Sequence, residues 1–405
     1  MITLDLHGHL NPMTTLGAEL RSRRHQVTLL GSSLGRKLAE QAGLNWSPLN
    51  DTSEAMSGWN QLGRLSGLSA LKHTGRLVNQ NAKAIFDELP GHISTLKIDA
   101  LVIDQFTPAA AIVAENQKIP YVVACNALAV HLHPSVPPTS LNWPYRRGVF
   151  GNMRNRFGNW ITKLLFDTFA GAGRKGGISP LLLVDLKKKW GEAIVSQQPE
   201  CFEFPNHPRP SHFHYTAPWH VKGRDKSIFF PWEKLDGRPL VFASLGTLQN
   251  QLLDLFIKIV DAARGLNLQL VLSLGSQVAK WEFDVPDNVI VVPFAPQLQL
   301  LDRSAAVITH AGLNTALEAV SRGLPMICLP ITNDQPGIAR RIEYHGAGIV
   351  LHPNRATANQ IRSKLQVILS DPVFQKKSIA LRDQVVKLQG LRIAADIIEN
   401  AVCKK

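Results

Sequence analysis

The stretch FAPQLQLLDRSAAVITHAGLNTALEAVSRGLPMICLPITNDQ, residues 294 to 335, joins two short apolar runs to polar residues. AVIT ends at His310, and PMICLP is followed shortly by Asp334 and Gln335. Continuous apolar runs of this length are typical of strands in a parallel sheet that is covered on both faces. Ligands of such sheets bind beyond the carboxyl ends of the strands, so we expect these three side chains at a binding site. An ordinary polar turn before Pro336 is the alternative for the last two.

Between the two strands, a helix is expected to begin at a tight turn. Ala311 and Gly312 form the turn, and Asn314 and Thr315 open the helix. The free N–H groups and positive dipole at such a helix start suit a diphosphate, although Asn and Thr are also common structural N-caps. One turn further along, Glu318 either reaches ribose hydroxyls or is a solvated helix carboxylate.

The same alternation of strand and helix extends over the 405 residues. In the first half ITLDL, QVTLL, LNWSPL, DALVIDQF and IPYVVACN are the expected strands, and two helices are expected between residues 53 and 96. From Pro239 the pattern restarts with LVFASLGT, LQLVLSLG, NVIVVPF, AVITHAG and PMICLP. The chain is too long for one ordinary core, so the sequence predicts an α/β protein of two Rossmann-like domains.

The domain boundaries follow from a change in composition. PNHPRPSHFHYTAPWH is rich in Pro and His and suits an extended linker better than a helix. We place an N-terminal domain at residues 1–215, a linker at 216–236 and a second domain at 237–380. A helical segment at 381–405 completes the chain, and packing of this segment on the N-terminal domain is one option.

Charge and cysteine usage restrict the classes of function. Lys and Arg total 44 against 31 Asp and Glu, and a formal charge of +13 favours an anionic partner such as a phosphate ligand or an acidic lipid surface. No helix-turn-helix, RNP or zinc pattern occurs, so no nucleic-acid partner is predicted. The four scattered cysteines form no C-x-x-C pair. Without an apolar run of about 18 residues or a signal-peptide pattern, a cytoplasmic protein is expected.

The stretch from 294 to 335 resembles the signature segment of the UDP-glycosyltransferases, the inverting two-domain GT-B family with a cleft between its domains. That family includes plant secondary-product enzymes and bacterial macrolide and carotenoid glycosyltransferases. The residues that match its donor contacts are Phe294, which would stack on uracil; Ala295 and Gln297, for base and ribose; His310, Gly312, Asn314 and Thr315, for the diphosphate; Glu318, for the ribose; and Asp334 and Gln335, for the sugar hydroxyls.

Two further features of this donor segment bear on the resemblance. Phe294 stands where plant members have Trp, but base stacking should survive because every aromatic ring offers a π-face. Thr247 of SLGT matches an additional phosphate contact, and the ending Asp334-Gln335 resembles that of glucose users. The resemblance therefore implies UDP-glucose as co-substrate, with no cofactor. The absence of any D-x-D sequence predicts no metal site.

The resemblance also implies the catalytic residues. His9, in the G-H-L turn after the first strand, matches the general base, and an imidazole near neutral pKa suits that role. His7 ranks second, and a lone His near a terminus is more often a surface residue. Asp104, which ends the strand LVID, matches the carboxylate that holds the base; a cap for the helix near Pro108 is its alternative. The expected reaction is a single displacement with inversion.

The acceptor is harder to read from the sequence. GHLNPMTTLGAEL and DQFTPAAA most resemble bacterial zeaxanthin (carotenoid) glucosyltransferases, which implies a lipophilic acceptor such as a carotenoid, terpenoid or polyphenol. Basic and aromatic residues interleave over 145–175, which suits either peripheral contact with an anionic membrane or an amphipathic helix packed on the N-terminal domain. The alternatives are a macrolide-type or lipid-linked cell-wall glycosyltransferase, or a non-catalytic nucleotide-sugar-binding protein. The presence of His9 and Asp104 argues against the last.

Overall fold

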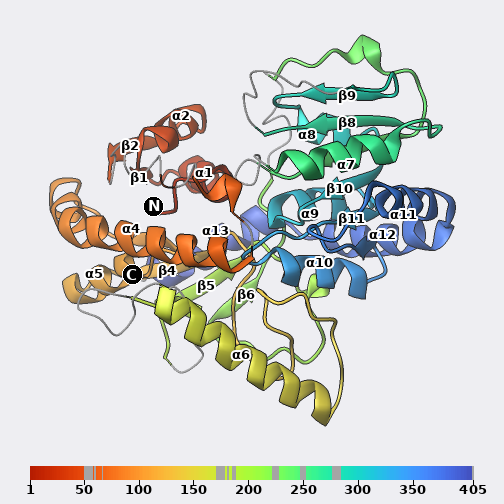
Figure 1. Ribbon diagram of the computed structural model, residues 1–405. Coiled ribbons are helices and arrows are strands. Elements are labelled where there is room, and N and C mark those ends of the chain that lie inside the picture. The colour runs from red at the N-terminus through yellow and green to blue at the C-terminus, as the bar shows by residue number, and fades with distance from the viewer. Residues whose placement is uncertain are drawn as a thin grey trace.

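The protein folds into two α/β lobes, each with a parallel sheet covered by helices (Figure 1). The structure is a computed structural model that describes residues 1–49, 58, 61–65, 67–169, 178–179, 182–184, 188–220, 228–246, 252–275 and 284–403. Thr247, a predicted phosphate contact, lies outside the described residues. The predicted α/β class is confirmed.

The N-terminal lobe is built on the strand order β3-β4-β5-β6, with the pair β1-β2 beside it. Its strands are β1 (Thr28–Gly31), β2 (Asn45–Pro48), β3 (Leu101–Asp104), β4 (Tyr121–Cys125), β5 (Ala193–Ser196) and β6 (Phe213–Tyr215). Ile2 forms single bridges to Leu30 and to Ile103, and so connects the pair to the larger sheet. The strand expected over ITLDL is thus reduced to one residue, because a helix begins at His7.

Helices cover both faces of this sheet. They are α1 (His7–Ser22), α2 (Ser33–Gln41), α4 (Gly67–Thr95), α5 (Pro108–Gln117) and α6 (Val149–Phe169), with 3₁₀ turns η1 (Leu62–Arg64), η2 (Leu182–Val184) and η3 (Glu200–Phe202). Of the two helices predicted between residues 53 and 96, α4 is one, and it runs unbroken past Pro90. Most of the segment before it lies outside the described residues. Its buried residues, among them Val78, Ile85 and Leu89, recur at helical spacing and pack against α5 and α6.

The C-terminal lobe has six parallel strands in the order β12-β11-β10-β7-β8-β9. The strands are β7 (Leu240–Ser244), β8 (Gln269–Ser273), β9 (Val289–Val292), β10 (Ser304–Thr309), β11 (Met326–Cys328) and β12 (Gly348–Val350). Its helical elements are η4 (Trp232–Lys234), α7 (Leu253–Ala263), α8 (Gln297–Leu301), α9 (Leu313–Val320), α10 (Gln335–Tyr344), α11 (Ala358–Ser370) and α12 (Pro372–Val385). All residues of β7 and β8 are buried, as expected for strands covered on both faces.

Two segments that join the lobes are more than an extended linker: one forms strand β6, and the other forms the last helix. β6 lies inside the Pro- and His-rich stretch, where it pairs with β5 as a three-residue edge strand; prolines are tolerated at such edges. The last helix, α13 (Gly390–Val402), packs on α1, β4 and β5 of the N-terminal lobe. Ala394, Ala395 and Ile398 supply its buried face. The chain therefore crosses between the lobes more than once.

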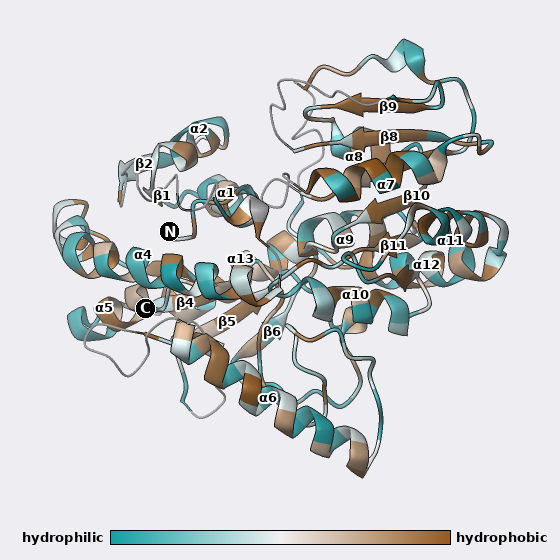
Figure 2. Ribbon diagram, viewed as in Figure 1, coloured by the Kyte–Doolittle hydropathy of each residue, from teal (hydrophilic) through white to brown (hydrophobic). Residues whose placement is uncertain are grey.

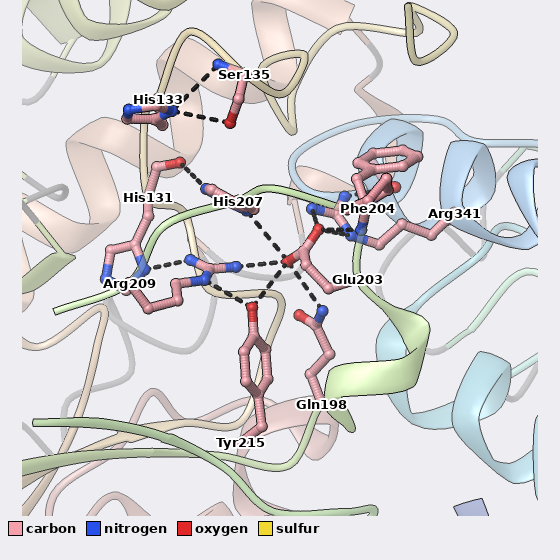
Figure 3. A network of polar contacts seen from close by, with 12 residues as sticks. His131, His133, Ser135, Gln198, Glu203, Phe204, His207, Arg209, Tyr215 and Arg341 are labelled. Carbon is pink, nitrogen blue, oxygen red and sulfur yellow. Dashed lines mark hydrogen bonds and ion pairs between the residues drawn. The ribbon is translucent and has the colours of Figure 1, made fainter. Parts of the chain in front are cut away.

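A buried cluster of charged residues also joins the lobes (Figure 3). The Glu203 carboxylate, after η3, accepts hydrogen bonds from Arg341 of α10 at 2.5 and 2.9 Å and from Arg209 at 2.5 Å. Gln198 and His207 contact the same carboxylate. Close backbone contact continues along α10, where the Gly337 amide donates to the Thr139 carbonyl oxygen at 2.8 Å. These contacts fix α10, whose first residue is Gln335, against the N-terminal lobe.

Candidate active site between the lobes

A cavity of about 690 Å³ lies between the two sheets. The start of α1 forms one wall, and the carboxyl ends of β7, β8 and β10 together with the start of α9 form the facing wall. The predicted residues that line it are His9, Phe294, Ala295, Gln297, His310, Gly312, Asn314, Thr315, Asp334 and Gln335. The structure thus gathers residues from both halves of the sequence at one place, as the strand-end argument predicts.

His9 and Asp104 form a hydrogen-bonded pair at the N-terminal wall. The first turn of α1 presents His9, whose Nδ1 lies 2.7 Å from Oδ2 of the fully buried Asp104. Burial alone would lower the pKa of His9, but the charge and hydrogen bond of Asp104 outweigh it and raise the pKa. With Nδ1 held by the carboxylate, neutral His9 carries its proton on Nδ1, which leaves Nε2 as the basic atom.

The Asp104 carboxylate is itself held by three further donors. It accepts hydrogen bonds from Thr3 Oγ1 at 2.7 Å, from Asn126 Nδ2 at 3.0 Å and from the Phe106 amide at 2.9 Å. Burial would raise the pKa of Asp104, but His9 and the hydrogen bonds from Thr3 and the Phe106 amide outweigh it and lower the pKa. Thr107, and not Asp104, is the N-cap of α5, so the alternative capping role is wrong.

On the facing wall, His310 sits between two glycines. A Cβ on Gly312 would lie 2.6 Å from His310 Nε2, and one on Gly246 would lie 2.8 Å from the same ring, so neither position has room for a side chain. Burial lowers the pKa of His310 to about 4, against a smaller opposing effect of a hydrogen bond with the Ser244 backbone. The ring is neutral near pH 7. It would therefore offer a diphosphate a hydrogen bond and not a charge.

The turn from β10 into α9 points a helix start at the cavity. Ala311 adopts a left-handed conformation with φ of 64°, which is costly for a residue with a Cβ, and its amide donates to Thr309 Oγ1 at 3.1 Å. Gly312 is the N-cap, and α9 begins at Leu313. The amide groups of this first turn are the unpaired donors that an anion needs.

Gln297, Thr315 and Glu318 form a polar group beside α9. Gln297 Nε2 donates to Glu318 Oε2 at 2.5 Å and contacts Thr315 Oγ1 at 3.3 Å. Glu318 is fully buried, so the alternative of a solvated helix carboxylate is wrong. His220, which the sequence did not single out, lies 3.8 Å from Glu318 Oε1.

Asp334 and Gln335 play different parts at the start of α10. Asp334 Oδ2 accepts a hydrogen bond from the Leu128 amide of the N-terminal lobe at 3.0 Å. Burial raises the pKa of Asp334, and the Leu128 contact opposes that effect. Gln335 Oε1 accepts from the amides of Ile331 and Thr332, so its oxygen stabilises the turn before the helix.

A chain of amide side chains links the two walls, and the sequence reasoning missed it. Asn314 Nδ2 donates to the Gly8 carbonyl oxygen at 2.7 Å, and Gln197 Nε2 donates to Asn314 Oδ1 at 2.8 Å. Gln197 also bonds the carbonyl oxygen of Asn126, whose side chain reaches Asp104. Asn126 and Gln197 each follow a buried strand directly, so the rule that found His310 would also have found them.

Away from these polar groups, the N-terminal side of the cavity is lined largely by apolar side chains, namely Leu34, Leu38, Leu62, Val78, Phe106 and Val130. Asn11, Lys37, Gln41 and Thr74 also line it there. No group of three or more His, Cys, Asp or Glu side chains stands ready to hold a metal ion in the part of the chain that the structure describes.

Comparison with known proteins places this architecture in a family. Residues 257–395 match the C-terminal domain of erythromycin biosynthesis protein CIII-like proteins. A zeaxanthin glucosyltransferase of Pantoea ananas is 27% identical over 99% of this chain and 95% of its own length. A second, from Pseudescherichia vulneris, is 26% identical over 99% and 97%.

Solved structures show the same fold. The glycosyltransferase of kitacinnamycin superimposes with a TM-score of 0.73 at 20% identity, covering 99% of this chain and 98% of its own. CalG4, the calicheamicin glycosyltransferase, gives 0.71 at 19% identity over 98% and 96%. These structures show that the chain has the GT-B fold. The match over residues 257–395 and the full-length similarity to the zeaxanthin glucosyltransferases support a glycosyltransferase enzyme, similar to the macrolide- and carotenoid-type UDP-glycosyltransferases.

Proposed function

We propose that this enzyme transfers glucose, or a related hexose, from a UDP-sugar to a hydroxyl group of a lipophilic small molecule, with inversion of the anomeric carbon. The observation that carries the proposal is the His9–Asp104 pair, which faces the α9 start and His310 across one cavity. A base on one wall and an anion-binding helix start on the other are the two parts that a single displacement requires.

In this mechanism the acceptor hydroxyl gives its proton to His9 Nε2 as its oxygen attacks the anomeric carbon. The bond between that carbon and the β-phosphate oxygen breaks, and UDP leaves with the bonding electrons. Asp104 stabilises the imidazolium that forms on His9, because its carboxylate is buried and already hydrogen-bonded to Nδ1. The amides at the start of α9 and the His310 ring receive the charge that develops on the diphosphate.

Each part of the donor is assigned to the residues that the sequence singled out. Phe294 is 40% exposed and lines the cavity, so a face of its ring is accessible to uracil. Gln297 and Glu318 are proposed to bind the ribose, and ribose binding would replace part of their mutual hydrogen bond. Asp334 and Gln335 are proposed to bind the glucose hydroxyls. Thr247, outside the described residues, is proposed as a further phosphate contact.

The acceptor is proposed to occupy the apolar, N-terminal part of the cavity. Leu34, Leu38, Val78 and Val130 give this part an apolar lining with few polar groups, Lys37, Gln41 and Thr74 among them, which suits a carotenoid, terpenoid or polyphenol. Similarity to the two zeaxanthin glucosyltransferases supports the carotenoid choice. Because such acceptors partition into bilayers, we propose that the enzyme acts in the cytoplasm and meets the membrane peripherally.

A donor and acceptor screen tests the proposal. The purified chain is incubated with UDP-glucose, UDP-galactose or TDP-glucose, and with zeaxanthin, a terpenoid alcohol or a flavonol. We expect β-glucosides and UDP, with UDP-glucose preferred, detected by mass spectrometry and by the anomeric coupling constant in NMR. Calorimetric binding of UDP separates donor recognition from acceptor choice. Absence of both UDP binding and transfer with every pair would contradict the proposed function.

A further inference from the structure

Helix α6 has its apolar side facing outward. Six large apolar residues spaced mostly three or four positions apart follow one face of the helix, with exposed fractions between 51% and 89%. They are Val149, Phe150, Met153, Phe157, Trp160 and Leu164. We call this set the outer face of α6. Hydrophobic residues recur along the helix in Figure 2, at the lower edge of the molecule.

Over residues 149–162 the inner face of α6 is made of small and polar residues instead. Asn155 Nδ2 donates to the Pro134 carbonyl oxygen at 3.0 Å, and Thr162 Oγ1 lies 3.2 Å from Ser140 Oγ. A Cβ at Gly158 would lie 2.5 Å from the Trp143 ring, so only glycine allows this close packing. Near the end of the helix Phe166 is buried in the N-terminal core, with Leu165 and Phe169 packed against it. The alternative that α6 packs apolar side chains on the N-terminal domain thus holds for its last turns and not for the outer face.

Basic residues surround the outer face. Residues 145–169 contain four arginines and one lysine but a single acid, Asp167, which pairs with Lys163. Arg146, Arg147 and Arg156 are exposed. Apolar and aromatic side chains flanked by cations match the interface of an anionic bilayer, where rings enter the headgroup layer and cations contact lipid phosphates.

We infer that α6 docks the enzyme on an anionic membrane surface, with the outer face inserted among the headgroups. The part of the chain that the structure describes holds no helix long and apolar enough to span a bilayer, so the contact is peripheral. On the opposite side of the same helix, Phe166 lines the interlobe cavity. Docking through α6 therefore brings the apolar end of the cavity next to the lipid. This last step rests on the proposed function, whereas the docking itself does not.

Vesicle flotation of the full chain tests the inference. One set of vesicles is phosphatidylcholine alone, and the other also contains phosphatidylglycerol. We expect binding to the anionic vesicles that weakens with salt, and a loss of about tenfold or more in F150E/W160E. F229E, which changes a phenylalanine that is 85% exposed elsewhere, is the matched control and should bind as the parent does. R146Q/R147Q/R156Q should lose the preference for anionic lipid.

The outcomes separate docking from catalysis. Equal vesicle binding by the parent and by F150E/W160E, or no binding by the parent, would overturn the inference. A parent dimer in size-exclusion chromatography that F150E/W160E converts to monomer, without vesicle binding, would overturn it in favour of contact between copies. Transfer to a water-soluble acceptor without vesicles should be unchanged in F150E/W160E. If no transfer is found for any variant while vesicle binding persists, the proposed function fails and the docking stands.

Discussion

Asp104 sets the proton affinity of His9 from a fully buried position. Burial disfavours a charged imidazole, and without the carboxylate it would leave His9 a weak base. The charge of Asp104, 2.7 Å from Nδ1, reverses that balance and raises the pKa of His9. His9, Thr3 and the Phe106 amide in turn keep Asp104 ionised, since they lower its pKa. A base of this kind is both oriented and strengthened by one neighbour.

Replacing His9 and replacing Asp104 should therefore affect activity in different ways. His9→Ala removes the base and should lower turnover by about two to four orders of magnitude. Asp104→Asn leaves burial as the dominant effect on His9, so the pKa of His9 falls and the acid limb of kcat/KM moves to lower pH, with reduced turnover. Rate profiles from pH 5 to 9 check this, with the exposed Asp87→Asn on α4 as the control. An unmoved acid limb in Asp104→Asn would contradict the assigned role.

The residues of this site differ in how far the sequence could predict them. Asp104 was found through the family resemblance, and the structure places it behind His9. His310 and Asp334 were found because they are polar groups after strand ends, and the structure places both around one cavity. Asn126 follows the same rule but lies outside every motif. The deep burial of Glu318 depends on tertiary packing, which no local pattern shows. Gln335 Oε1 bonds the amides of its own turn, a local role that the sequence reasoning did not assign.

At the scale of elements, α10 connects the lobes through Arg341. That guanidinium is fully buried and paired with Glu203, while Arg36 of α2 pairs with Glu40 at the surface, where their side chains are 60% and 58% exposed (Figure 3 shows the Glu203 cluster). Removal of one partner from a buried pair leaves an uncompensated charge, whereas an exposed pair contributes little. The two arginines thus offer a comparison between a buried and an exposed ion pair.

Arg341→Met should lower the free energy of unfolding by about 3 kcal/mol, because Glu203 stays buried with fewer donors. Arg36→Met should lower the free energy of unfolding far less, because its pair with Glu40 is exposed. Urea unfolding followed by tryptophan fluorescence measures both, and Glu203→Gln combined with Arg341→Met should cost less than the sum of the single changes. Equal costs for the two arginines would show that the Glu203 cluster does not hold the lobes together.

The sequence predicted helices and strands correctly where the hydrophobic pattern was long. The prediction failed where tertiary packing determines whether a strand or a helix face forms. The strands β7 to β11 were expected from continuous apolar runs, and they form. The sequence did not predict β6, because its three residues lie among prolines and its pairing depends on β5. The period of α6 is helical, but only the structure shows that Asn155, Gly158 and Thr162 face inward.

At the scale of the whole molecule, buried titratable groups make the fold sensitive to acid. Burial lowers the pKa of His310 and of His207 to about 4, and the pKa of His131 falls well below its ordinary value of 6.5 for the same first reason. Burial would raise the pKa of Glu203, but Arg341 and the other cations around it hold that pKa well below 4.5. His9 has the opposite effect on stability as the pH falls, because its pKa is raised.

The direction of the effect follows from proton uptake. Below about pH 6.5 these histidines bind protons in the unfolded chain but not in the fold, and below about pH 4.5 Glu203 does the same. The contribution of these groups to the free energy of unfolding is therefore fully present near neutral pH. It declines as the pH falls from 6.5 toward 4, and His9 offsets part of the loss. Thermal midpoints across this range should fall, and less steeply in His207→Gln than in the parent or in the exposed His352→Gln. A midpoint that stays constant from pH 7 to 4.5 would mean that these rings become protonated within the folded protein.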